Sequence, residues 1–202
     1  MGKVDENKHQ KLEALYKNAY DLFLTQGIEK TSISDIAKKA GVAKGTFYLY
    51  FTDKYDIRDQ LIAKTADKLF RDAYEAMNGA HISSLEDRII LVVDYVLDCM
   101  QHNKPMLRFI SKNLSWGIFR HAITASLPDE DISAYSIYQK LLLENSEVRL
   151  RDPKTMLFLI IELASSTSFS TILENDPVSF DELKPYLNDS IRAIIRNHIL
   201  SE

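Results

Sequence analysis

The sequence predicts an all-α fold of about nine helices over its 202 residues. Apolar side chains recur at steps of three and four residues along most of the chain, which is the spacing of one face of a helix. Start and stop signals separate these segments: hydroxyl or acidic residues precede them, and glycine or proline follows. No alternation of apolar and polar residues is bounded by turn signals, so we expect no sheet.

The first two helices are expected in the N-terminal quarter of the chain. A helix of about residues 9–26 should end at Gly27. Its apolar face is formed by Leu12, Leu15, Tyr16, Ala19 and Phe23. Thr31-Ser32 has hydroxyl groups that can cap a second helix. That helix should end at Gly41, because glycine adopts positive φ without a side-chain clash.

The third helix, expected from Ala43 to Phe51, divides its side chains between a packed face and a free face. At about 100° per residue, Phe47 and Phe51 share one arc, and the burial preference of phenylalanine assigns that arc to a core. The other side chains are Lys44, Gly45, Thr46, Tyr48, Leu49 and Tyr50. Phenols suit an interface that is half apolar and half wet, whereas packing inside the protein is the alternative for Tyr48 and Tyr50.

The free side chains suit the groove of duplex DNA. Hydroxyl, phenol and ammonium groups donate hydrogen bonds to phosphate oxygens, and Gly45 lets the helix approach the base edges. Lys54, just beyond the helix, adds a positive charge. The candidate DNA-binding residues are Thr31, Ser32, Ser34, Lys44, Gly45, Thr46, Tyr48, Leu49, Tyr50 and Lys54.

Residues 9–60 resemble the N-terminal domain of the tetracycline-repressor (TetR) family of transcriptional regulators. The matching positions are Gly27, Thr31, Ile36, Ala37, Ala40, Gly41, Val42, Lys44, Gly45, Thr46, Phe47, Tyr48, Tyr50, Phe51 and Lys54. So long an ordered match is much more specific than a lone helix-turn-helix pattern. The resemblance implies a three-helix, helix-turn-helix DNA-binding domain in residues 1–55 and a larger helical effector-binding and dimerisation domain in residues 56–202.

The distribution of charge along the chain agrees with a DNA partner better than the net charge of the whole chain does. The net charge is −4, yet residues 1–55 contain nine lysines against seven acidic residues. The lysines cluster in and around the second and third expected helices. A basic excess this small predicts moderate DNA affinity with measurable salt sensitivity.

Capping and breaking residues delimit the later helices. The expected features are a fourth helix from Asp53 to about Asn78-Gly79, a fifth from Ser84 to about His102, a sixth beginning near Pro105, an acidic break at Leu127–Asp131, a start at Asp152-Pro153 and a capping box at Ser179–Glu182. Pro185 is expected to kink the opening of the last helix or to shift its start.

The last two helices have the composition of a subunit interface. Small residues in 156–173 allow another helix to come close, and isoleucines form a stripe on the final helix. The candidate interface residues are Ser165, Ser168, Phe169, Ile191, Ile195 and Ile199. Closing the core of the chain itself is the alternative. The resemblance favours a two-fold dimer, which requires a palindromic operator with half-sites about 34–36 Å apart or a multiple of one helical turn.

Aromatic and flexible side chains of the larger part suit an effector pocket, although they suit an ordinary core equally. The candidates are Tyr95, Met100, Phe109, Trp116, Phe119, Tyr138 and Glu162. Glu162 is a lone acid in an apolar run. If it is buried it needs a base or a cationic or hydroxylated ligand; otherwise it faces solvent or a dimer rim.

Several classes are disfavoured. We find no catalytic triad ordering, P-loop or dinucleotide fingerprint, so an enzyme is not expected. The single cysteine, Cys99, excludes an intrachain disulfide and is expected to be buried, and His102 and His121 lack partners at metal-ligand spacing. We therefore expect no cofactor. No uncharged apolar run of 18 residues and no signal core occur, which predicts the cytoplasm.

We therefore expect a ligand-responsive, DNA-binding regulator, specifically a homodimeric repressor with an unknown small-molecule effector. The resemblance implies that the effector displaces the fourth helix, so that the two DNA-binding units no longer match the operator. Physically this is a population shift, set by the different affinity of the effector for two dimer shapes. The alternatives are a helical ligand-binding protein or enzyme that retains the fold without specific operator binding, and a nonspecific architectural DNA binder.

Overall fold

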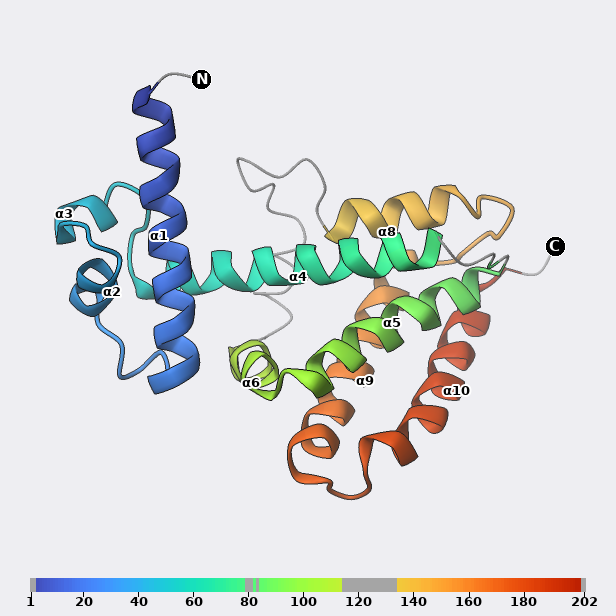
Figure 1. Cartoon of the computed structure of the whole chain (residues 1–202). Helices are drawn as coiled ribbons and strands as arrows, with labels where there is room; N and C mark the ends of the chain where they lie inside the picture. Colours follow the sequence, from blue (N-terminus) through green and yellow to red (C-terminus); the bar gives the residue numbers. More distant parts are fainter. Residues whose placement is uncertain (1–2, 79–81, 83, 114–133, 201–202) are drawn as a thin grey trace. The chain divides into compact units, whose positions relative to one another are not determined.

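The computed structural model describes residues 3–78, 82, 84–113 and 134–200, and in those ranges it contains nine helices and no named strand (Figure 1). The helices are α1 (Lys3–Gln26), α2 (Ile33–Lys39), α3 (Lys44–Phe47), α4 (Lys54–Asn78), α5 (Leu85–His102), α6 (Lys104–Asn113), α8 (Ala134–Leu143), α9 (Pro153–Glu174) and α10 (Phe180–His198). The all-α prediction is confirmed. The chain forms two compact units, Met1–Thr65 and Ala66–Glu202, called here the N-terminal and C-terminal units.

The N-terminal unit is built on an aromatic core. Phe47 and Phe51 are 0% and 2% exposed, as the arc of the third helix predicts. The rings of Tyr16 and Phe51 meet edge to face with their centroids 5.3 Å apart. Helix α1 begins at Lys3, about six residues earlier than expected, and acidic residues in its first turn suit the positive end of the helix dipole.

Helix α3 is shorter than the sequence predicts. It ends at Phe47, and the expected helical stretch through Phe51 continues as turns. The amides of Leu49 and Tyr50 donate to the carbonyls three residues earlier, at 3.2 and 3.0 Å, which is the tighter 3₁₀ pattern. The Phe51 amide still donates to the Phe47 carbonyl four residues earlier, at 3.0 Å, so the turns after α3 keep one α-helical bond.

The C-terminal unit has a separate apolar core in which α9 packs mainly against α10. Its most buried side chains include Met156, Ile191 and Ile195, each 0% exposed. Helix α10 starts at Phe180 behind the predicted capping box, and Pro185 lies inside the helix without shifting that start. Cys99, expected to be buried, is only partly so. The expected acidic break Leu127–Asp131 lies outside the described residues.

By length and composition alone, α9 of the described part is apolar enough to cross a membrane. The core helix of a soluble protein has the same length and composition. Only 33% of its most apolar window is buried in the single chain. Helix α9 therefore keeps exposed apolar surface even though it packs against α5, α6 and α10.

Candidate nucleic-acid interface

The start of α2 is fixed by a capping box. The Ser32 hydroxyl accepts a hydrogen bond from the Asp35 amide at 3.1 Å, and the Ser32 amide donates to the Asp35 carboxylate at 3.0 Å. Hydrogen bonds from Ser32 hold the pKa of Asp35 below its usual value. The Ser32 hydroxyl is thus engaged in the cap, while Ser34 is exposed in the first turn of α2.

A Schellman motif ends α2 and aims the chain into α3. Gly41 has a φ of +69°, and the Val42 amide donates to the Ala37 carbonyl at 3.0 Å. The Gly41 amide donates to the Lys38 carbonyl at 3.2 Å, which completes the two-bond pattern. This turn is therefore hydrogen-bonded and conformationally defined, as a helix-turn-helix requires.

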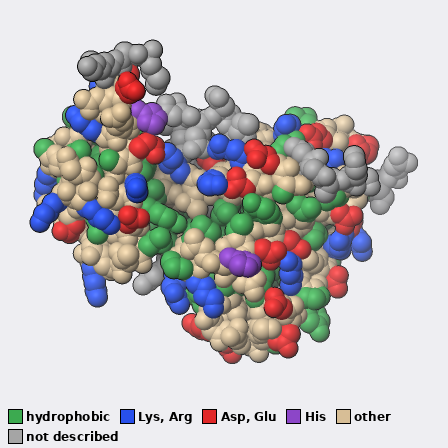
Figure 2. Space-filling model, in the orientation of Figure 1, with side chains coloured by type: hydrophobic (Ala, Val, Ile, Leu, Met, Phe, Trp, Pro, Cys, Tyr) green, Lys and Arg blue, Asp and Glu red, His purple; other side chains and the backbone are tan. Residues whose placement is uncertain are grey.

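The outward side of α3 and the turn after it exposes large side chains. Tyr48 is 52% exposed and Leu49 is 79% exposed, beside the exposed Lys44 and Gly45 and the half-buried Thr46. Figure 2 shows Lys and Arg side chains spread along the left edge of the view, over the region of α2 and α3. The structure thus brings these five predicted residues onto one short exposed segment.

Besides Ser32, three predicted DNA contacts have partners inside the N-terminal unit. Thr31 is 2% exposed, and its hydroxyl donates to the Gly27 carbonyl at 2.8 Å. The Tyr50 hydroxyl donates to the Lys8 carbonyl at 3.2 Å. The Lys54 ammonium is bound to backbone carbonyls of the turn before α2. The family pattern alone did not reveal these internal roles.

The predicted interface residues divide between the core and the surface of the C-terminal unit. Ile191, Ile195 and Ser168 are each 0% exposed. The Ser168 hydroxyl has no hydrogen-bond partner among the described residues. Ser165 and Phe169 are partly buried, and Ile199 is 38% exposed. The buried isoleucines close the core of their own chain, which was the alternative interpretation of the stripe.

The outward faces of the same two helices carry a different set of residues, which the isoleucine stripe obscured in the sequence. On α10 the exposed residues at steps of four, three and four are Tyr186, Ser190, Ala193 and Asn197. On α9 they are Thr155, Leu159, Glu162 and Ser166. We call these eight residues the outer α9–α10 face. Glu162 is exposed in the single chain and needs no buried partner.

The predicted effector residues that the structure describes lie mainly on three further helices. Phe109 on α6 and Tyr138 on α8 are 4% and 8% exposed, and the Tyr138 hydroxyl donates to the Pro153 carbonyl at 2.7 Å. Tyr95 and Met100, both on α5, are partly buried. Trp116 and Phe119 lie outside the described residues. The described members therefore pack within the C-terminal unit or at its surface.

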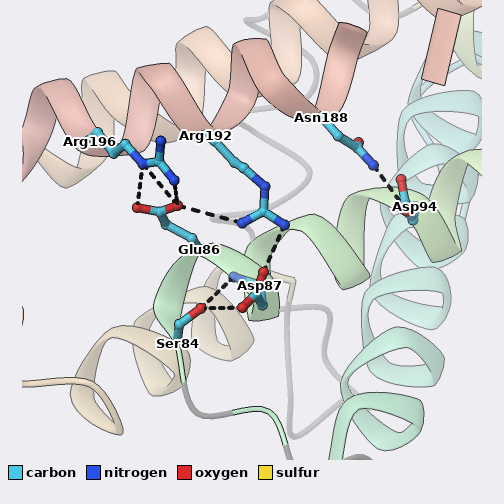
Figure 3. A network of polar contacts seen from close by, with 7 residues as sticks. All are labelled: Ser84, Glu86, Asp87, Asp94, Asn188, Arg192 and Arg196. Atoms are coloured by element: carbon cyan, nitrogen blue, oxygen red, sulfur yellow. Dashed lines mark hydrogen bonds and ion pairs between the residues drawn. The ribbon is translucent and has the colours of Figure 1, made fainter. Parts of the chain in front are cut away.

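A polar network, which sequence reasoning did not single out, fixes α10 to α5 (Figure 3). Arg192 binds Asp87 at 2.7 Å and Glu86 at 3.5 Å, and Arg196 binds Glu86 at 3.0 Å. Hydrogen bonds from Ser84 and then Arg192 lower the pKa of Asp87. The network therefore joins the first turn of α5 to the C-terminal half of α10.

Comparison with known proteins finds a family match within the N-terminal unit. Residues 15–61 match the family model described as bacterial regulatory proteins, tetR family. The HTH-type transcriptional regulator YvdT of Bacillus subtilis (strain 168) is 41% identical over 69 residues, and the chain spans 34% of its length. The HTH-type transcriptional regulator SAR2658 of Staphylococcus aureus (strain MRSA252) is 29% identical over 140 residues, which are 65% of this chain and 74% of that one.

Solved structures extend the likeness over most of the chain. The transcriptional regulator FadR from Bacillus subtilis, in complex with stearoyl-CoA, gives a TM-score of 0.66 at 17% identity, with 91% of this chain and 99% of that chain covered. A tetR family transcription regulator from Shewanella sp. PV-4 gives a TM-score of 0.65 at 16% identity, with 95% and 99% covered. At these identities the likeness is one of fold.

Proposed function

The chain belongs to the tetR family of bacterial regulatory proteins and is a DNA-binding transcriptional regulator, and on that premise we propose that it is a homodimeric repressor released from a palindromic operator by a small-molecule effector. One observation supports the DNA-binding surface above all. Tyr48 and Leu49 are exposed at the end of a hydrogen-bonded helix-turn-helix whose phenylalanines, Phe47 and Phe51, are buried. Large exposed apolar groups on a defined scaffold are typical of an interaction site.

The exposed segment has a suitable group for each kind of DNA contact. The Lys44 ammonium and the Tyr48 hydroxyl donate to phosphates, which sets the register of the protein on the duplex. Gly45 leaves room for a base edge, since no atom of the protein that could contact a Cβ at this position lies within 4 Å of it. Leu49 offers an apolar contact for the C5-methyl group of thymine in the major groove.

We assign the dimer contact to the outer α9–α10 face. Its small side chains, Ser190 and Ala193 among them, permit close approach of two helices, and Leu159 and Tyr186 provide apolar area. A second copy also covers the exposed apolar surface of α9. This surface explains why the helix is apolar enough in composition for a membrane span. On this proposal the protein acts in the cytoplasm as a four-helix-bundle dimer.

We propose that the effector binds in the C-terminal unit and acts through α4, which continues from one unit into the other. Occupancy shifts the dimer toward a shape that no longer fits the operator spacing. A long-chain acyl-CoA is the first effector class to test, because FadR from Bacillus subtilis, similar in fold, is known with stearoyl-CoA.

The test begins with selection of an operator from a pool of random duplexes by repeated rounds of binding. The expected product is a palindrome that the protein binds at least about 10³-fold more tightly than random duplex at fixed salt. Lys44→Ala with Tyr48→Ala should strongly lower the affinity for this operator, because both proposed phosphate contacts are removed. Lys104→Ala, an exposed lysine of the C-terminal unit, is the matched control and should leave it unchanged.

Two outcomes contradict the proposal. Equal affinity for selected and random duplex indicates a nonspecific architectural binder. Unchanged operator affinity in the Lys44 and Tyr48 double variant shows that the contact surface lies elsewhere. Release of operator DNA by stearoyl-CoA, followed by fluorescence anisotropy, then tests the effector class separately from DNA binding.

A further inference from the structure

The ammonium of Lys54, at the first residue of α4, lies among three backbone carbonyls of the turn that precedes α2. The Nζ atom donates to the carbonyls of Ile28, Glu29 and Thr31 at 2.9, 3.3 and 3.4 Å. An ammonium has three N–H donors and no acceptor, so these three carbonyls account for all of its donors. Lys54 is also half-buried. A phosphate contact by this side chain would require breaking one or more of these bonds.

Lys54 adds to the hydrogen bonding of the turn of residues 27–31. The Gly27 carbonyl accepts from the Thr31 hydroxyl, and the Lys30 carbonyl accepts from the Gln26 amide group. Lys54 binds the carbonyls of the other three residues, of which the Ile28 carbonyl also accepts from the Thr31 amide at 3.1 Å. The bonds to Ile28 and Thr31 are partly buried, and a buried backbone acceptor is costly when unpaired, so the lysine stabilises this conformation of the turn. The turn also follows the C-terminus of α1, where the negative end of the helix dipole favours a cation.

Within its own helix, by contrast, Lys54 lies at an end that disfavours a cation. The first turn of a helix is the positive end of its dipole, and a cation there is disfavoured. The same turn of α4 contacts the end of the helix-turn-helix through Asp56, which accepts from the Thr52 amide at 2.8 Å. The start of α4 is therefore bonded both to the segment before α2, through Lys54, and to the segment after α3, through Asp56.

We infer that Lys54 is a positioning residue for operator binding: it fixes the helix-turn-helix on the first turn of α4 and does not neutralise a DNA phosphate. This inference rests on the proposed operator-binding function. Removal of the ammonium frees the turn before α2, so Tyr48 and Leu49 no longer meet their phosphate and base in a fixed register. The number of phosphates that the protein neutralises stays the same.

Salt titration separates the two roles. The full-length variants Lys54→Met and Lys44→Met are titrated with the selected operator and with random duplex over a range of salt concentrations. For Lys44→Met, the slope of log affinity against log salt should decrease by about 0.9 for each phosphate that the variant no longer neutralises, on both DNAs. Lys54→Met should weaken operator binding several-fold while the slope and the affinity for random duplex stay at wild-type values.

Two results overturn the inference. A decrease in slope for Lys54→Met equal to that of Lys44→Met identifies Lys54 as a phosphate ligand. Unchanged operator affinity in a folded Lys54→Met protein removes the positioning role. If circular dichroism shows that Lys54→Met does not fold, Lys54→Gln, which keeps two N–H donors but no charge, is titrated under the same two criteria. Failure of the proposed function is distinguishable, because the wild-type protein then shows no preference for any selected duplex.

Discussion

The hydroxyl of Tyr74 donates to the carboxylate of Glu144 at 2.6 Å, although the two residues are 70 positions apart in the chain. The other carboxylate oxygen accepts from Arg88 at 3.0 Å. Glu144 therefore ties the C-terminal part of α4 to α5 and to the turn after α8. This arrangement holds one end of the helix through which we expect the effector to act.

Removing that hydroxyl tests its contribution to stability. Tyr74→Phe should lower the free energy of unfolding of the C-terminal unit by about 1 to 2 kcal/mol, because it removes a hydrogen bond to a charged acceptor in a partly buried place. Urea unfolding followed by circular dichroism measures this. Tyr55→Phe removes the same atom from a side chain that is 40% exposed and lies outside the outer α9–α10 face, and it should change nothing. Equal stability of the two variants would show that the bond contributes no net free energy.

The two glycines of the helix-turn-helix should separate stability from DNA binding. Neither position has an atom within 4 Å of an added Cβ, but only Gly41 has positive φ. Gly41→Ala should cost about 1 to 2 kcal/mol, because an L-residue is strained there. Gly45→Ala should be neutral or stabilising, by up to about 1 kcal/mol, since alanine favours a helix. Its operator affinity should nevertheless fall, because the methyl group keeps α3 from the base edges.

Thermal unfolding and anisotropy titration of the two variants check this pair. A Gly45→Ala protein with wild-type operator affinity would show that α3 does not approach the bases as closely as proposed. A Gly41→Ala protein as stable as the wild type would show that the turn adopts another conformation in solution.

The acidic residues Asp87 and Asp94 of α5 should have opposite effects on stability as the pH falls. The pKa of Asp87 is lowered by its hydrogen bond to Ser84 first and to Arg192 second. Its contribution to the free energy of unfolding is therefore present above the pKa of the unfolded state, and it is lost as the pH falls through the pKa of the folded state. Burial is the main cause of the raised pKa of Asp94. For Asp94, acidification instead relieves an unfavourable ionised state.

Single substitutions test these signs by urea unfolding at a series of pH values from neutral to below 4, the range in which carboxylates titrate. Asp87→Asn should be less stable than the wild type at neutral pH and should lose less stability on acidification. Asp94→Asn should lose more stability on acidification, because a compensating proton uptake is removed. The reverse order of the two slopes would contradict the assignment.

Substitution of the outer α9–α10 face should dissociate the dimer without unfolding the chain. Ala193→Arg places a charge on that exposed face, so sedimentation should show monomers, and operator affinity should fall because binding is no longer bivalent. Ser146→Arg, at an exposed site in a turn of the same unit, is the control. Ile195→Asp should unfold the C-terminal unit instead, since Ile195 is fully buried. A dimeric Ala193→Arg protein would exclude this face.

The sequence predicts local features of this fold better than it predicts partners across space. The hydroxyl cap at Ser32, the capping box at Ser179 and the stop at Gly41 follow from chemistry within a few residues, and all three occur as expected. The end of α3 was misplaced because the helical period of the side chains continues through Phe51, whereas the Leu49 and Tyr50 amides bond to carbonyls three residues earlier. The direction in which successive side chains point is much the same in a turn of α-helix and in the turns that follow it.

The roles of individual site residues depended on contacts that no local pattern reveals. Lys54 matches the family pattern equally well as a phosphate ligand or as a partner of carbonyls 23 to 26 positions away. Ile191 and Ile195 form an apolar stripe whether it faces the core or a second subunit. The packing of α9 on α10 decides between these two environments, and it places both side chains in the core of their own chain.

The exposure of Leu49 has a consequence for how the protein distinguishes its target in cells of differing ionic content. Attraction between lysines and phosphates weakens as ions are added, whereas the fit of a leucine against a methyl group involves no charge to screen. Concentrated electrolyte therefore lowers the affinity for bulk chromosomal sequence and for the operator alike, while the part of the preference that the proposed Leu49 contact supplies is left unchanged. On this proposal the protein keeps that part of its selectivity under osmotic stress even while its total occupancy declines.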